Sequence, residues 1–218
     1  MKSIALYVWQ LSVWIIILPL LVGAINFYKL DKQSRYVFYL VLLATIPQLL
    51  TAFISRTVLL DFIYNAYTPM EFLLVYLFIG RSLESSLFKN ISMGTVVAFG
   101  ILVFGFIFYF GMQAKFFNEW VAVANIFYLT WILLFVLESL KNEKKLIDAR
   151  QPLFWYLSGL ILYTPCTVIV FALYYHIDTS RNILIKNLWI IHGVFNIILY
   201  LFFTIGLYKT RRQRMTVL

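Results

Sequence analysis

The sequence predicts an all-α membrane protein, a bundle of seven transmembrane helices with its N-terminus outside and its C-terminus in the cytoplasm. Hydrophobic residues make up 63% of the 218 residues and charged residues only 12%, and the mean hydropathy is +0.88. A soluble domain carries about a quarter charged residues. Each crossing needs about 20 apolar residues, so a chain of this length holds about seven crossings with short connections. We therefore expect one membrane domain over residues 1–218.

Charged and turn-forming residues divide the chain into seven apolar segments. The predicted helices lie at about 4–28, 36–55, 60–80, 91–112, 118–138, 153–175 and 184–208. The first segment is about 25 residues long and contains Gln10 and Pro19, whereas the apolar part of a signal peptide is about 7 to 15 residues long. We therefore interpret this segment as a retained first helix.

The basic residues of the connections predict the orientation. Thirteen of them fall on one side: Lys29, Lys32, Arg35, Arg81, Lys89, Lys141, Lys144, Lys145, Arg150, Lys209, Arg211, Arg212 and Arg214. Five fall on the other: Lys2, Arg56, Lys115, Arg181 and Lys186. Cytoplasmic loops carry the excess of Lys and Arg, so the richer side is predicted to be cytoplasmic in the inner membrane. The net charge of +9 therefore sets orientation, and nucleic acid is not an expected partner.

The third predicted helix contains the principal candidate residue, Glu71. Among the acids, it alone lies deep inside a predicted helix, about 16 Å from the outer end at 1.5 Å per residue. Ionisable residues at this depth are costly, which makes them functional candidates. Tyr64, Thr68 and Glu71 follow the spacing that places residues on one helix face. Pro69 has no N–H for the carbonyl of Asn65, so a kinked polar site is expected here.

Further polar residues are predicted in the outer half of the bundle. His192 and Asn196 lie one turn apart on the seventh helix, and Gln48 and Tyr163 lie on the second and sixth. We predict that Glu71 and His192 face one cavity that opens to the outside. Its expected ligand-binding residues are Glu71, His192, Asn196, Thr68, Tyr64, Gln48 and Tyr163. The alternative is interhelical hydrogen bonding, in which a protonated Glu71 binds His192, Gln48 or a freed carbonyl and only holds the helices together.

Several classes of site lack the residues that they require. A bis-histidine haem needs two facing histidines, and His192 is the only one inside a predicted helix. A hydrolytic zinc site uses three protein ligands, and a retinal Schiff base needs a buried lysine, whereas Lys186 lies at a helix end. We therefore expect no cofactor, no metal and no assigned catalytic residue. The single cysteine, Cys166, is interpreted as a packing residue.

Four segments resemble one family of membrane proteins. They are LPLLVGAIN at 18–26, YNAYTPMEFLLVYLF at 64–78, FWYLSGLILY at 154–163 and IHGVFNIIL at 191–199. With their Tyr-Thr-Pro-x-Glu run and His-x-x-x-Asn pair, they resemble an uncharacterised family of small seven-helix integral membrane proteins common in Bacteroidota. The resemblance covers nearly the whole chain and implies the same topology. The family has no established activity to carry over.

Two functional hypotheses remain open, with a third behind them. A receptor-like sensor or accessory component would bind a small molecule from the outer side and act through a cytoplasmic effector protein. A transporter would use the same pocket alternately from both sides. The third is an intramembrane acid–base enzyme that uses Glu71 and His192. The nearly apolar inner halves of the helices favour the sensor, because a transport path also needs a polar lining inwards. The lipid bilayer is the one partner common to all three.

Overall fold

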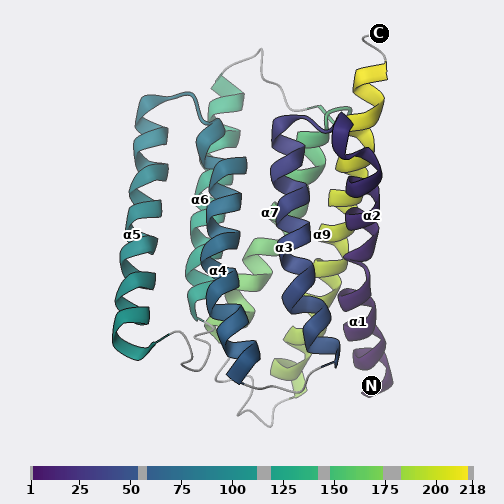
Figure 1. Ribbon diagram of the computed structural model, residues 1–218, viewed down its shortest axis with the longest axis vertical. Coiled ribbons are helices and arrows are strands. Elements are labelled where there is room, and N and C mark those ends of the chain that lie inside the picture. Colours follow the sequence, from purple (N-terminus) through teal and green to yellow (C-terminus); the bar gives the residue numbers. More distant parts are fainter. Residues whose placement is uncertain (1, 54–57, 112–118, 142–147, 174–182, 216–218) are drawn as a thin grey trace.

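The computed structural model describes residues 2–53, 58–111, 119–141, 148–173 and 183–215. These residues form helices joined by short turns, with no strand among them (Figure 1). The α-helices are α1 (Lys2–Trp14), α2 (Ile17–Asn26), α3 (Lys32–Phe53), α4 (Val58–Phe78), α5 (Ser86–Phe110), α6 (Glu119–Lys141), α7 (Pro152–Ala172) and α9 (Ile183–Met215). Two 3-10 turns, η1 (Phe27–Lys29) and η2 (Gly80–Ser82), follow α2 and α4.

Seven stretches of the described chain are helical, long enough and apolar enough to cross a membrane. They confirm the all-α fold and the seven predicted crossings. The stretches are Ala5–Lys29, Lys32–Thr51, Val58–Ser82, Ser86–Phe110, Glu119–Lys141, Pro152–Ala172 and Asn187–Thr210. The predicted helix ends at residues 55, 112, 118 and 175 lie outside the described residues.

The first crossing extends over Ala5–Lys29 as predicted, but a two-residue turn divides it into α1 and α2. Ile15 and Ile16 form a turn, in which the N–H of Leu18 donates to the carbonyl of Ile15 at 3.1 Å. Pro19 causes this shift, since it has no N–H to give to that carbonyl. By contrast, Pro47, Pro69 and Pro165 lie inside the continuous helices α3, α4 and α7.

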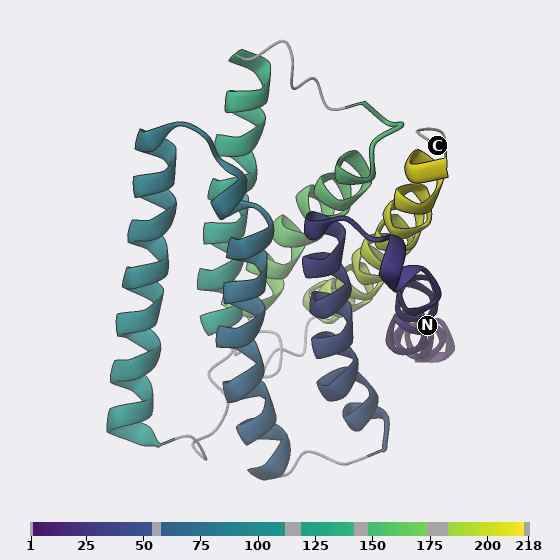
Figure 2. The same ribbon diagram turned by 45° about the horizontal axis from the view of Figure 1, so that its top comes forward.

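Helix α9 lies at the centre of one half of the bundle. It packs against α7 on one side and against α1 and α2 on the other, while α3 packs on α4 and α6 packs on α7 and α4. Helix α5 stands at the outer flank beyond α4 and α6 (Figures 1 and 2). Only 11% of its apolar window is buried, against 28% to 44% for the other six crossings. Most of its surface is therefore left for lipid.

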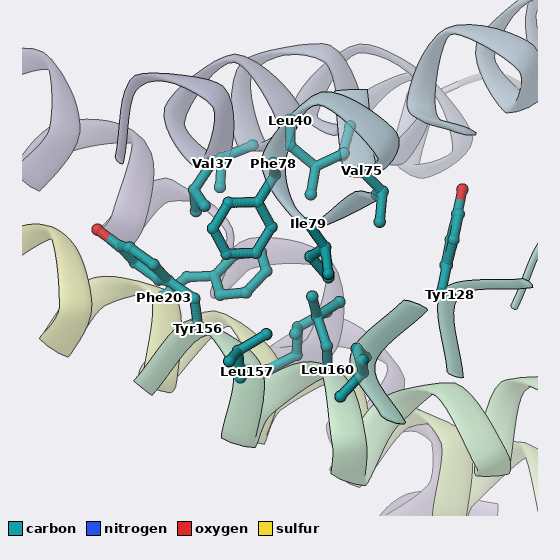
Figure 3. Close-up of a cluster of buried hydrophobic side chains, with 14 of the residues drawn as sticks. Val37, Leu40, Val75, Phe78, Ile79, Tyr128, Tyr156, Leu157, Leu160 and Phe203 are labelled. Carbon is teal, nitrogen blue, oxygen red and sulfur yellow. The ribbon is translucent and has the colours of Figure 1, made fainter. Parts of the chain in front are cut away.

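The buried core joins α4, α7 and α9 through large apolar side chains (Figure 3). The ring of Tyr156 lies edge-on to Phe78, at 5.8 Å between centroids, and to Phe203 at 6.0 Å. Tyr156 also covers Gly206 so closely that a Cβ at this glycine would overlap the ring. Close packing of this kind holds helices together in a membrane, where lipid is as apolar as the side chains.

One end of the bundle, at the top of Figure 1, carries most of the described basic residues and is called the basic end below. Two polar groups fix helices there. The Glu138 carboxylate on α6 accepts hydrogen bonds from the backbone N–H groups of Glu84 and Ser85, at the start of α5. Ser34 on α3 hydrogen-bonds Thr210 on α9 at 2.9 Å and accepts from Tyr156 on α7 at 3.0 Å. The helix halves at the basic end are thus less uniformly apolar than expected.

Candidate functional site

Glu71 lies among tyrosines that come from four helices. Its side chain is hydrogen-bonded to Tyr67, one turn earlier on α4. The phenol groups of Tyr128 on α6, Tyr163 on α7 and Tyr200 on α9 also interact electrostatically with its carboxyl group. These five residues are called the carboxyl–tyrosine cluster. Because it draws on α4, α6, α7 and α9, it forms only when these helices are packed together.

The cluster has a buried floor and an accessible side. Tyr128 is 2% exposed and Tyr200 is 6% exposed, whereas Glu71, Tyr67 and Tyr163 are half-buried. The Tyr128 hydroxyl has no hydrogen-bond partner among the described residues. Buried polar groups are nearly always hydrogen-bonded, so this hydroxyl marks a place where a ligand or water would complete the site.

The carboxyl group of Glu71 has no cationic partner in the described part of the chain. The one ion pair there joins Arg150 to Asp148 at 3.9 Å, and it is exposed at the basic end. A charged carboxyl group inside a membrane is costly unless it is paired. Glu71 is therefore either protonated or completed by a cation that the described chain does not supply.

The helices around the cluster are not all in close contact. The backbone of α4 comes close to α3 and α6 but little to α7 or α9, which it meets through side chains such as Phe78 and Tyr156. Glu71 nevertheless interacts with Tyr163 and Tyr200, which belong to those two helices. Side chains, rather than touching backbones, therefore span the region between α4 and the α7–α9 pair. Such a region can be rearranged more readily than a tightly packed helix pair.

A second polar group, called the Ser12 network, surrounds the break in the first crossing. Around the break, the carbonyl groups of Leu11, Ile15 and Ile16 accept backbone hydrogen bonds. The Ser12 carbonyl does not, so it is one of the open acceptors at a helix end. Side chains occupy it. Gln48 Nε2 donates to it at 2.6 Å and Asn196 Nδ2 at 3.2 Å, while Gln48 Oε1 accepts from Tyr200 at 2.8 Å. The network thus joins α1, α3 and α9.

His192 has mainly aromatic neighbours. Its ring contacts the rings of Tyr163 at 5.4 Å, Phe171 at 5.6 Å and Trp189 at 5.9 Å between centroids. Its Nδ1 atom is buried without a hydrogen-bond partner among the described residues. No hydrogen bond or ion pair joins it to Glu71 among the described residues, but Tyr163 contacts the His192 ring and interacts electrostatically with Glu71.

The predicted polar stripe on α4 is divided between two neighbourhoods. Tyr64 lies near Tyr163 and Tyr200, with which it interacts electrostatically. Thr68 donates to the Tyr64 carbonyl at 3.0 Å but lines a mostly apolar recess toward α5 and α6. This recess is bounded by Asn65, Thr68, Pro69, Phe99, Val103, Phe106, Ile107 and Trp120. Glu71 is not among these residues.

Sequence reasoning missed four residues of the site: Ser12, Tyr67, Tyr128 and Tyr200. The spacing of Tyr67 and Glu71, four residues apart, was a usable signal because it places side chains in contact on a helix. The other two tyrosines were hidden among 19% aromatic residues. No group of three or more His, Cys, Asp or Glu that could hold a metal ion occurs among the described residues.

Comparison with known proteins found no similar protein. No family model matches the chain, and neither a curated protein nor a solved structure matches it. The family resemblance of its motifs therefore rests on those motifs alone, and what stands is the architecture of seven membrane-spanning helices.

Proposed function

We propose that the protein is a receptor-like sensor of the inner membrane, with its N-terminus outside and the basic end in the cytoplasm. A small ligand enters from the outer side and binds in the carboxyl–tyrosine cluster. The observation that carries the proposal is the double role of Tyr200. Its phenol group interacts electrostatically with Glu71 in the cluster, and it donates a hydrogen bond to Gln48 in the Ser12 network.

Through this link, binding of a ligand can change the arrangement of the helices. A ligand that displaces Tyr200 loosens the amide of Gln48, which in turn holds the Ser12 carbonyl at the break. The two short helices α1 and α2 pack along α9, so their relative position depends on this network. A ligand shifts such an equilibrium by the difference in its affinity for the two states. A cytoplasmic effector protein would bind at the basic end and respond to the changed helix arrangement.

The core next to the cluster supports a sensor over a transporter. On the side of the basic end, Phe78, Ile79 and Phe203 are each 1% exposed. Leu157 and Leu160 fill the same layer at 3% exposed (Figure 3). A transport path to the cytoplasm would need a polar or hydrated lining through this layer. The layer is tightly packed, and its buried polar groups Ser34, Thr210 and Tyr156 are bonded to one another, which favours a site that binds a ligand and returns it to the same side.

The test uses the full chain in lipid nanodiscs exposed to a small-molecule extract of bacterial cells. We expect compounds retained by the wild-type protein, identified by mass spectrometry, to be lost with Glu71→Gln. They should be kept with the control Glu119→Gln, which changes an exposed acid at the start of α6. The same compounds should not accumulate inside proteoliposomes. Accumulation would establish transport in place of sensing, and the absence of any Glu71-dependent compound would overturn the ligand site.

A further inference from the structure

We infer that the ligand of the carboxyl–tyrosine cluster is a small organic cation, an alkylammonium compound held by the Glu71 carboxylate and the surrounding tyrosines. This inference rests on the proposed function, because it names the ligand class of the same site. It follows from three properties of the cluster: its charge, its aromatic lining and its accessible side.

The cluster has an acid without a positively charged partner among the described residues. Glu71 is its single ionisable acid, and among the described residues no Lys, Arg or His forms an ion pair with it. His192 is occupied by aromatic neighbours instead. A buried charge in a membrane protein is normally paired. A ligand that brings one positive charge supplies the missing partner, whereas an anionic ligand would face the carboxylate without compensation.

The lining selects an organic cation rather than a metal ion. Calcium takes six to eight oxygen ligands, and magnesium needs an octahedral set. The described residues offer no group of three or more metal-binding side chains. The cluster instead places Tyr67, Tyr128, Tyr163 and Tyr200 around one carboxyl group. Aromatic side chains attract alkylammonium groups through their ring faces and bury the attached methyl or methylene groups.

The accessible side gives such a ligand an entry. Glu71, Tyr67 and Tyr163 are half-buried, and the backbone of α4 comes little into contact with α7 or α9. Tyr128 lies on the floor of the cluster at 2% exposed, and its hydroxyl has no partner among the described residues. A hydrogen-bonding group on the ligand would satisfy this hydroxyl. We therefore expect the tightest ligands to carry a hydroxyl or N–H group as well as the positive charge.

The experiment compares charged and neutral molecules of the same shape. Methylammonium, tetramethylammonium and choline are titrated into the full chain in nanodiscs, with 3,3-dimethylbutan-1-ol as the neutral isostere of choline. Binding is measured by calorimetry in the wild type, Glu71→Gln and Glu71→Asp. We expect at least one ammonium compound to bind, the neutral isostere to bind more weakly, and Glu71→Gln to lose roughly 10- to 100-fold in affinity, as for a hydrogen bond to a charged group. Glu71→Asp should retain part of the affinity, because the charge remains.

Substitutions of Tyr163 test whether its aromatic ring contributes to ammonium binding. Tyr163→Phe should keep ammonium binding within about threefold, because the ring remains, whereas Tyr163→Leu should lose about tenfold or more, the upper part of the range for cation–π contacts. Tyr76→Leu is the control, since Tyr76 lies on α4 outside the cluster and contacts Met93. Size-exclusion profiles and melting curves confirm that each variant is folded.

Each contrary result has a defined meaning. Equal binding of choline and its isostere, unchanged binding in Glu71→Gln, or binding of sodium or potassium in place of the ammonium compounds would each overturn the inference. Failure of all ammonium compounds, while an extract compound still binds in a Glu71-dependent manner, would overturn the ligand class but leave the proposed function standing. If neither binds, the carboxyl group holds only a proton, and both proposals fail.

Discussion

Tyr200 on α9 donates its phenolic hydrogen to the side-chain carbonyl of Gln48 on α3, at 2.8 Å. The amide nitrogen of the same Gln48 donates to the Ser12 carbonyl at 2.6 Å. Gln48 is therefore held at both ends of its amide group, and one side chain links three helices. The consequences can be measured through stability, packing and topology.

The first prediction concerns this link. Tyr200→Phe removes the hydroxyl but keeps the ring, so it should lower the free energy of unfolding by about 0.6 to 2 kcal/mol, the range for hydrogen bonds between membrane helices. Steric trapping or denaturation in mixed micelles would measure the change. Tyr208→Phe on the same helix is the control, because Tyr208 is 57% exposed. An equal effect of both substitutions would show that the bond to Gln48 contributes nothing specific.

The second prediction concerns the attachment of α5. Glu138 is 9% exposed, and its carboxylate binds the N–H groups of Glu84 and Ser85. Glu138→Ala leaves these donors unpaired and should cost about 1.5 to 3 kcal/mol, as for hydrogen bonds to a charged group. Hydrogen exchange at residues 84–90 should accelerate. Glu119→Ala, at the exposed start of α6, should leave exchange there unchanged, and protection that survives Glu138→Ala would contradict the cap.

The third prediction concerns the contact between Gly206 and Tyr156. An alanine at position 206 places a methyl group against the buried ring of Tyr156, which also holds Ser34 through its hydroxyl. Gly206→Ala should therefore destabilise the bundle by about 1 to 3 kcal/mol, the usual range for overpacking. The control is Gly100→Ala on α5, where nothing lies within 4 Å of the added carbon. Melting curves in detergent should separate the two variants clearly.

The fourth prediction concerns orientation in the membrane. In a Cys166→Ala background, Arg150→Cys should react with an impermeant thiol reagent only after the membrane is opened. Glu119→Cys should react in intact cells. Both positions are exposed. Glu119 begins α6 and Arg150 precedes α7, and the starts of these two helices lie at opposite ends of the bundle (Figure 1). Labelling in the reverse order would contradict the positive-inside argument.

The sequence was sufficient for the helices but only partly for the site. Seven crossings follow from length and hydropathy because each helix must satisfy its own backbone in lipid. Glu71 could be found because it is the only acid deep inside a helix, and Tyr67 follows from their spacing. The neighbours Tyr128 and Tyr200 depend on the order and rotation of separate helices, which hydropathy does not encode.

Two details of the structure could not be read from the sequence. Pro19 was visible in the sequence, but the break occurs earlier in the chain, at Ile15 and Ile16, because a proline disturbs the carbonyl four residues before it. His192 was expected to face Glu71, since both lie at similar depths. Its ring contacts Tyr163, Phe171 and Trp189, and a cavity shared with Glu71 stays a prediction. Depth in a bilayer says nothing about direction around a helix.

Because α5 lies at the outer flank of the bundle, most of its surface is surrounded by the hydrocarbon chains of lipids. Its exposed side chains, such as Ile101, Phe104 and Phe108, meet acyl chains rather than neighbouring helices. Exchanges among aliphatic and aromatic residues there should therefore leave the rest of the bundle undisturbed. The inward residues Ser92 and Phe99 have no such freedom, because each is fitted against α4 or η2. One face of α5 thus tolerates substitution because it meets lipid, whereas the opposite face does not because it packs on protein.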